Sequence, residues 1–104
     1  MTPPDAATLR FARDAWIRAL QRTASIERDL KGTLPVLIEQ LAQQYDSAPA
    51  LESTDTALSY RELAVRCRRY ARWGLAQRLG QGDVVALFMP NCPEYLAVWL
   101  GLTR

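Results

Sequence analysis

The side chains able to carry out chemistry in this 104-residue chain are few, and they lack the partners that catalysis needs. The sequence contains no histidine, which excludes a Ser-His or Cys-His nucleophile pair and a histidine metal ligand within these residues. No spacing of Asp and Glu indicates a metal site or a paired-carboxylate mechanism. The sequence therefore predicts no catalytic, cofactor-binding or metal-ligating residue in this chain.

The two cysteines, Cys67 and Cys92, are too few for a zinc ribbon or a disulfide framework, and their scarcity fits a reducing cytosol. Cys67 falls on the apolar face of an expected helix, which predicts an inert core thiol. Cys92 opens another expected helix, a position that favours somewhat greater reactivity.

Two further patterns have a functional and a structural interpretation. The segment Gly80-Gln81-Gly82-Asp83 resembles a phosphate loop, but it follows a helix and precedes a strand, so a helix cap and turn are favoured. Arginines crowd one side of the helix expected before it, and such a face either binds RNA or an anionic membrane or is simply solvated. The solvated face is the commoner case. The arginines are Arg61, Arg66, Arg68, Arg69, Arg72 and Arg78.

The elements that position these residues begin with two helices. A helix near 5–22 is capped by Asp5, and we expect Asp14 to pair with Arg18 on its polar side. Gly32 ends this region. A helix over 34–45 follows, with Thr33 as its N-cap and a proline in its first turn. The apolar face of the first helix comprises Leu9, Ala12, Trp16, Ala19 and Leu20.

A hairpin and a βαβ unit are expected next. Strands near 50–53 and 57–60 lead into a helix near 60–79, which Ser59 and Glu62 begin as a capping box and Gly80 ends. The run at 84–89 is apolar on both faces, which predicts an interior parallel strand and a right-handed crossover.

The last helix, near 91–103, is predicted to start at Asn91, with Glu94 completing the cap. It is apolar on nearly every side, and a small sheet cannot cover such a helix. We therefore expect this chain to be the front part of a larger protein, and to self-associate through residues 95–102 when isolated. The apolar residues are Tyr95, Leu96, Ala97, Val98, Trp99, Leu100 and Leu102.

Several segments resemble the beginning of adenylate-forming (AMP-binding) enzymes, and in particular bacterial long-chain and very-long-chain acyl-CoA synthetases of the fatty acid transport protein type. They are 33–42 (TLPVLIEQLA), 49–51 (PAL), 58–64 (LSYRELA), 70–73 (YARW) and 82–104 (GDVVALFMPNCPEYLAVWLGLTR). The resemblance covers about residues 14–104. It implies an α/β fold, here the N-terminal part of the adenylate-forming fold, incomplete as a domain. It also implies an N-terminal helical extension at 1–32 and the start of the AMP-binding domain at 33–104.

The same resemblance implies a parent enzyme that uses ATP, Mg and CoA to convert a fatty acid into acyl-CoA through an acyl-adenylate. The family's catalytic motifs match no position here, so the 104 residues alone are expected to be inactive and to bind none of these cofactors. The partners implied are the remainder of the synthetase and, in the parent, the fatty acid, but no nucleic acid. The expected location is the cytoplasm, extending to the inner membrane face as a peripheral protein, because no signal-peptide pattern opens the chain.

Two other classes of protein stay open. One is a non-catalytic standalone domain that binds a partner through its apolar last helix. The other is a small protein whose basic helix binds RNA or a membrane surface, for which salt-dependent binding to a polyanion would be the sign.

Overall fold

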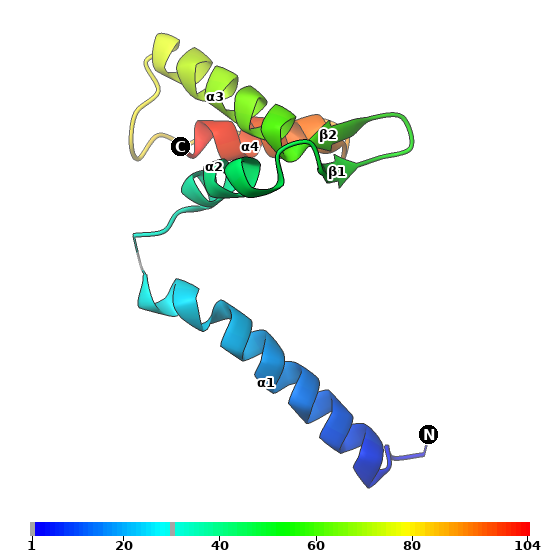
Figure 1. Cartoon of the computed structure of the whole chain (residues 1–104). Coiled ribbons are helices and arrows are strands. Elements are labelled where there is room, and N and C mark those ends of the chain that lie inside the picture. The colour runs from blue at the N-terminus through cyan, green and yellow to red at the C-terminus, as the bar shows by residue number, and fades with distance from the viewer. Residues whose placement is uncertain (1, 30) are drawn as a thin grey trace. The chain divides into compact units, whose positions relative to one another are not determined.

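The computed structural model describes residues 2–29 and 31–104, which divide into two compact units, Met1–Gly32 and Thr33–Arg104 (Figure 1). The first unit contains helix α1 (Ala6–Arg28). The second contains α2 (Leu34–Tyr45), β1 (Pro49–Glu52), β2 (Ala57–Ser59), α3 (Tyr60–Ala76) and α4 (Pro93–Leu102).

Helix α1 begins as the sequence predicts, because the carboxylate of Asp5 accepts a hydrogen bond of 2.7 Å from the backbone N–H of Thr8. Hydrogen bonding to Thr8, from its side chain and then from this backbone N–H, holds the pKa of Asp5 below its usual value. The helix continues beyond the predicted residue 22 to Arg28, and none of its residues is buried. The predicted pairing of Asp14 with Arg18 is wrong: Asp14 lies 3.7 Å from Arg13 instead. Both partners are largely exposed, and such pairs are individually weak.

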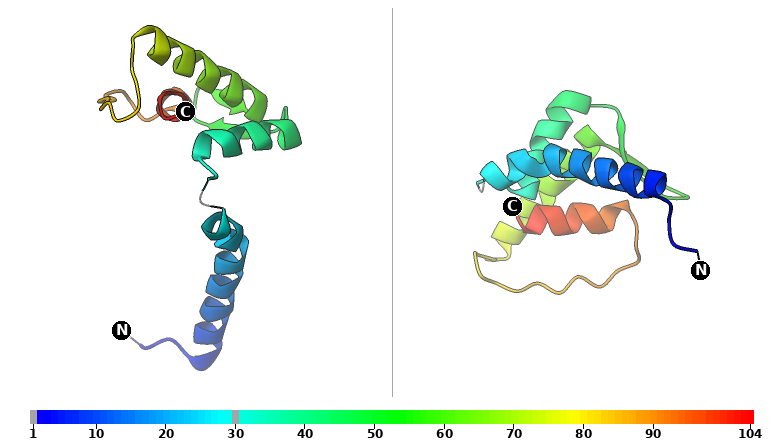
Figure 2. Two further views of the ribbon diagram at one scale, coloured as in Figure 1. Left: turned by 90° about the vertical axis from the view of Figure 1, so that its left-hand side faces the viewer. Right: turned by 90° about the horizontal axis from the view of Figure 1, so that it is seen from below.

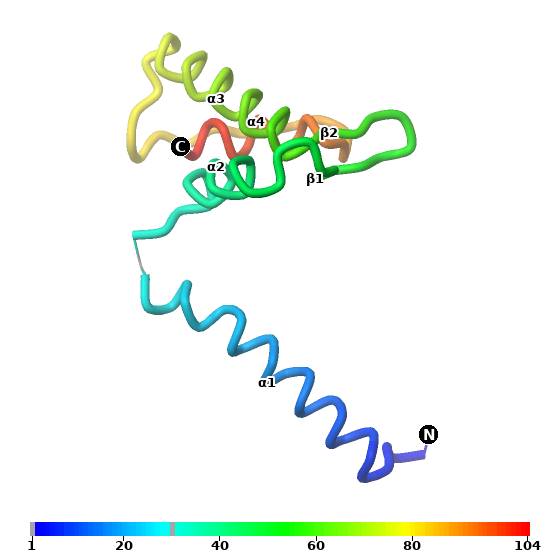
Figure 3. Tube along the Cα trace, viewed as in Figure 1, coloured from blue at the N-terminus to red at the C-terminus, as the bar shows by residue number. Residues whose placement is uncertain are grey.

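Helix α2 has the bounds predicted from its apolar spacing. Thr33 is its N-cap residue, although its side chain makes no capping hydrogen bond, and Pro35 is buried in the first turn. The hairpin follows, with β1 and β2 antiparallel and Leu51 opposite Leu58. Ser53 closes its loop, since its N–H donates to the carbonyl of Thr56 at 2.8 Å. Figure 3 shows this hairpin at one end of the helices of the second unit.

Helix α3 begins with the predicted capping box. The hydroxyl of Ser59 accepts from the N–H of Glu62 at 3.1 Å, and the Glu62 carboxylate accepts from the N–H of Ser59 at 2.8 Å. The predicted role of Gly80 at the other end is wrong. The helix ends at Ala76, and Arg78 adopts the left-handed conformation with φ of 62°. The N–H of Leu79 then donates a hydrogen bond to the carbonyl of Gly74, so the chain turns out of the helix at Arg78, before it reaches Gly80.

The predicted strand at 84–89 is also wrong, and with it the right-handed βαβ unit: the described residues form one sheet, of two strands. Figure 2 (right) shows this segment as a long extended connection between α3 and α4. Val84 is 96% exposed and Phe88 is fully exposed, while Leu87 and Met89 are half-buried. No described residue forms a backbone–backbone hydrogen bond with residues 84–89. The pattern is that of a strand, but a strand exists only where a neighbour pairs with it.

Helix α4 starts two residues later than predicted. Cys92 is its N-cap residue, in place of Asn91, and no side-chain capping bond forms. The core lies where α3 packs against α4 and α2, and its buried members are Leu63, Cys67, Ala97 and Leu100. Helix α4 was expected to be poorly covered by a small sheet, but α3 and α2 cover much of it, and Ala97 and Leu100 are buried. Trp99 remains 47% exposed.

Candidate functional site

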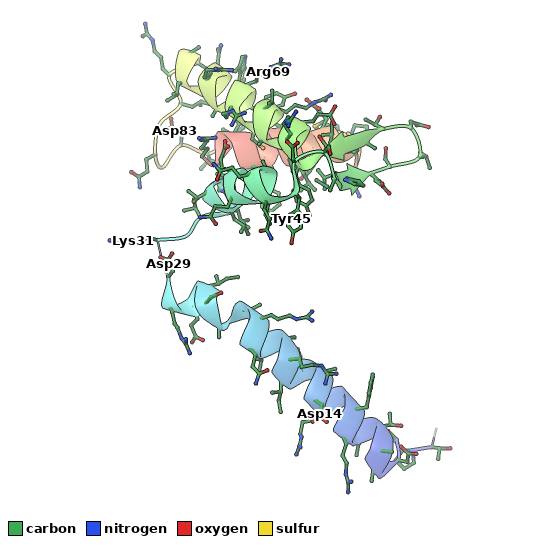
Figure 4. All side chains as sticks on the ribbon, viewed as in Figure 1. Asp14, Asp29, Lys31, Tyr45, Arg69 and Asp83 are labelled. Atoms are coloured by element: carbon green, nitrogen blue, oxygen red, sulfur yellow. The ribbon has the colours of Figure 1, made fainter. Side chains whose placement is uncertain are left out.

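The crossing of α3 and α4 brings together the most chemically distinctive side chains of the second unit. A cavity of about 440 Å³ opens at this crossing. It is lined by Arg66, Arg69, Tyr70, Trp73, Glu94 and Val98. Arg69, labelled in Figure 4, is exposed on the outer side of α3.

Glu94 is the centre of this group. One of its carboxylate oxygens accepts a hydrogen bond from the guanidinium of Arg66, and the other accepts from the hydroxyl of Tyr70. Arg66 and Tyr70 are four residues apart and therefore lie on one face of α3. Glu94 is the second residue of α4, where a negative charge also interacts favourably with the helix dipole. The predicted reciprocal cap by Glu94 is therefore replaced by a link between two helices.

The electrostatics of this group are those of a structural contact. The Tyr70 hydrogen bond, together with the Arg66 guanidinium, holds the pKa of Glu94 below its usual value. The same hydrogen bond, partial burial and the Glu94 charge raise the pKa of Tyr70. Glu94 therefore stays ionised and Tyr70 stays protonated around neutral pH. Neither group is poised to exchange a proton with a substrate at that pH.

A second ionic group joins α2 to α3 and to the end of the chain. The carboxylate of Glu39 accepts from Arg68 at 2.8 Å and from Arg104. Arg61 pairs with Asp46 in a third such contact. Three of the six arginines of the predicted basic face are thus engaged in ion pairs with neighbouring elements, which favours a structural role for that part of it. This reduces the charge available to RNA.

Helices α3 and α4 approach each other closely at Gly101. A methyl group placed there would lie 2.6 Å from Cβ of Tyr70 and 2.7 Å from the backbone oxygen of Cys67. Burial, with the charge of Glu39, raises the pKa of the Cys67 thiol, as expected for a core cysteine that is a poor nucleophile. Cys92 is half-buried.

The glycine-rich turn has the structural role that its position predicts. The N–H of Gly80 donates to the carboxylate of Asp83 at 2.8 Å, and the N–H of Asp83 donates to the carbonyl of Gly80 at 3.1 Å. A phosphate at this turn would meet a carboxylate where it needs free N–H donors. The residues of the turn therefore do not fit the phosphates of a nucleoside triphosphate.

Metal-binding clusters and membrane-spanning helices are both missing from the described residues. Across 2–29 and 31–104, no three Cys, Asp or Glu side chains gather into a group able to hold a metal ion. Within the same ranges, no helix combines the length and apolar character needed to cross a bilayer.

Sequence reasoning did not predict the contacts among Arg66, Tyr70, Glu94 and Glu39. One signal in the sequence points to them: Glu94 is the single charged residue of an otherwise apolar helix, and a partly buried carboxylate needs a partner. The partner's identity depends on how the helices cross, and this geometry cannot be deduced from local spacing.

The family model "AMP-binding enzyme" matches residues 38–104, more than half of the chain, so this chain belongs to the AMP-binding enzyme family. The resemblance seen in the sequence is thereby confirmed.

Individual relatives agree with this assignment. Over 79 residues, 74% of this chain, it is 40% identical to "Long-chain fatty acid transport protein 2" of Rattus norvegicus, covering 12% of that protein. Over 83 residues, 78% of this chain, it is 36% identical to "Long-chain-fatty-acid--CoA ligase" of Salmonella typhimurium, covering 15% of it. It is also 37% identical over 71 residues, 64% of this chain, to "Crotonobetaine/carnitine--CoA ligase" of Citrobacter koseri, covering 14% of that protein. No solved structure matches.

Proposed function

We propose that this chain forms a structural part of an AMP-forming fatty acyl-CoA synthetase. The observation that carries the proposal is the family match over residues 38–104, together with relatives whose names include fatty-acid ligation and fatty-acid transport. The chain spans about an eighth of the length of these relatives. The reaction and the substrates described next are therefore proposed for a longer enzyme of which these residues are a part.

The reaction proposed for that enzyme has two steps. The fatty acid carboxylate displaces pyrophosphate from ATP to form an acyl-adenylate, and the thiol of CoA then displaces AMP to form acyl-CoA. ATP, Mg and CoA are the cofactors of the longer enzyme in this proposal. We assign no step to a residue of this chain, because a carboxylate occupies the N–H donor of its glycine turn that a nucleotide phosphate would need.

The part that these residues play is to hold helices in place. Glu94 ties α4 to α3 through Arg66 and Tyr70, and Glu39 ties α2 to α3 through Arg68. Segment 84–89 is continuously apolar and largely exposed, and it is therefore suited to pair with strands of the longer enzyme. In this proposal the residues from 33 onward belong to the AMP-binding domain, and residues 1–32 form an extension to it.

Location and association are part of the same proposal. The protein is placed in the cytoplasm and at the inner membrane face, where fatty acids partition. An isolated chain is expected to self-associate through residues 95–102, because Trp99 stays exposed beside half-buried Tyr95, Leu96 and Val98.

A chimera tests the proposed function. The matching 83 residues of the Salmonella ligase are exchanged for the equivalent residues of this chain, and fatty-acid-dependent ATP–pyrophosphate exchange is measured with oleate. We expect the chimera to retain exchange and the 104-residue chain alone to show none. A matched chimera carrying Val84→Asp and Phe88→Asp should lose exchange, because charges enter the proposed strand. A soluble, folded first chimera without exchange, or exchange by the chain alone, would contradict the proposal.

A further inference from the structure

Helix α1 carries a concentration of exposed apolar side chains and of basic side chains. It spans 23 residues, and none of them is buried. Six large apolar side chains on this helix are between 41% and 71% exposed. They are Leu9, Phe11, Trp16, Ile17, Leu20 and Ile26.

These side chains are not scattered at random. At 100° per residue, Leu9, Trp16 and Leu20 fall within about 40° of one another, and the small residues Ala12 and Ala19 continue the same face. We call these five residues the apolar stripe of α1. The opposite side is charged and carries Asp14, labelled in Figure 4, with Arg18 and Phe11.

The charge of the chain is also concentrated in α1. The helix holds five arginines and two acidic residues, a formal charge of +3, whereas the whole chain has +2. The remaining residues are therefore slightly acidic as a group, with a formal charge of −1. The arginines are Arg10, Arg13, Arg18, Arg22 and Arg28.

We infer that α1 is a membrane-surface helix, which lies in the headgroup region of an anionic bilayer with its apolar stripe toward the acyl chains. The combination of a basic polar face with Trp and Leu on the other face is the pattern of interfacial helices. Trp16 suits this position because an indole ring is apolar over most of its surface and carries one N–H for the wet side. Arg13, next to the stripe, can extend its guanidinium outward to lipid phosphates while its methylene groups cover apolar surface.

A second copy of the helix fits this stripe less well. In a helix pair with heptad spacing, Leu9 and Trp16 would alternate with Ala12 and Ala19 along the seam. The resulting knobs are very unequal in size, and two such helices would also bring together ten arginines against four acidic residues. Anionic lipid neutralises that charge, whereas a second copy doubles it.

This inference deepens the proposed location at a membrane face, but it does not depend on the proposed reaction. Vesicle binding can fail while the chimera retains ATP–pyrophosphate exchange, and the reverse can also occur. The two failures are therefore distinguishable.

Sedimentation with sucrose-loaded vesicles tests the inference on the full 104-residue chain. The vesicles are equimolar phosphatidylglycerol and phosphatidylcholine, or phosphatidylcholine alone, in moderate salt. We expect the chain to bind the anionic vesicles and to bind the neutral ones at least about tenfold more weakly. Absence of binding to the anionic vesicles, or equal binding to both, would overturn the inference.

Two α1 variants and one control locate the surface. Each arginine near an anionic bilayer contributes about fivefold in affinity, so Arg18→Gln with Arg22→Gln should weaken binding by about 25-fold. Trp16→Gln with Leu20→Gln should weaken it by about tenfold or more. Glutamine keeps helix propensity, and circular dichroism of each variant in solution checks that the helix content is unchanged.

The control removes two charges from the basic face of the second unit instead, with Arg72→Gln and Arg78→Gln, and it should bind like the unaltered chain. A control that loses as much affinity as the α1 arginine variant would place the membrane surface on that face and refute the inference. Sedimentation velocity without lipid provides the remaining check. If the unaltered chain binds no vesicles and forms a dimer that Trp16→Gln with Leu20→Gln abolishes, a second copy of the chain covers the apolar stripe of α1. That result would also refute the inference.

Discussion

The close approach of α3 and α4 at Gly101 makes a sharp prediction for Gly101→Ala. The added methyl group would meet Cβ of Tyr70 at 2.6 Å and the backbone oxygen of Cys67 at 2.7 Å, both far inside normal contact distance. The oxygen belongs to the backbone of another helix and cannot rotate away. The helices must therefore separate, which disturbs the packing of Leu100 and Ala97 in the core.

Two effects of opposite sign set the magnitude. Alanine is favoured over glycine in a helix interior by about 1 kcal/mol, and this part stabilises the variant. Overpacking a close-packed contact costs about 1–3 kcal/mol, and contacts with backbone atoms belong to the upper part of that range. We therefore expect Gly101→Ala to lower the free energy of unfolding by about 1–2 kcal/mol. That is a large share of the stability of a small domain.

Gly74→Ala is the matched control, because Gly74 is also a buried helical glycine. Its added methyl group would lie 3.0 Å from Cδ2 of Leu102, the far end of a flexible side chain that can move. We expect Gly74→Ala to leave the free energy of unfolding unchanged or to raise it by up to about 1 kcal/mol. Urea denaturation followed by circular dichroism measures both variants. Equal stability of Gly101→Ala and the unaltered chain, or equal losses in the two variants, would refute the packing argument.

Three further predictions concern single side chains. Ser59→Ala should lower the free energy of unfolding by about 1 kcal/mol, because it removes the hydroxyl that caps α3, and a thermal melt without a shift would contradict this. The hydrogen bond from Tyr70 lowers the pKa of Glu94 in the folded chain, so the stabilisation by the Glu94 carboxylate is complete above its unfolded-state pKa and is lost as the pH falls through its folded-state pKa. Glu94→Gln should therefore show a flatter acid limb in a profile of stability against pH. An unchanged acid limb would contradict this prediction. Cys92 should react with a thiol reagent well before Cys67, whose pKa burial raises, and mass spectrometry of partly labelled chains would reveal the opposite order.

Local chemistry was sufficient to predict much of the fold. The bounds of α2 and the capping box of α3 follow from signals within one or two turns of chain, such as Pro35 in a first turn and Glu62 three residues after Ser59. The hairpin is equally local, with its loop closed between Ser53 and Thr56. Interactions between neighbours in sequence require no knowledge of distant elements, and for that reason these predictions agree with the structure.

Predictions at the ends of α3 and α4 were wrong where two local solutions compete. A left-handed residue closes α3 at Arg78, although Gly80 is the better residue for that conformation. Cys92 caps α4 one residue after Asn91, the stronger capping residue. At both helix ends the residue with the stronger local preference is not the one used, so a preference of about 1 kcal/mol at a single position does not decide where the helix begins or ends.

The sequence by itself was enough to establish the family, the helix and hairpin signals, and the absence of histidine. The ion-pair partners of Glu94 and Glu39 required the tertiary structure, because an ion pair across about thirty residues depends on the crossing of two helices. The state of 84–89 required it too. A continuous apolar run makes a buried strand favourable, but only backbone hydrogen bonds to a neighbouring strand form one, and no described residue of this chain provides that neighbour.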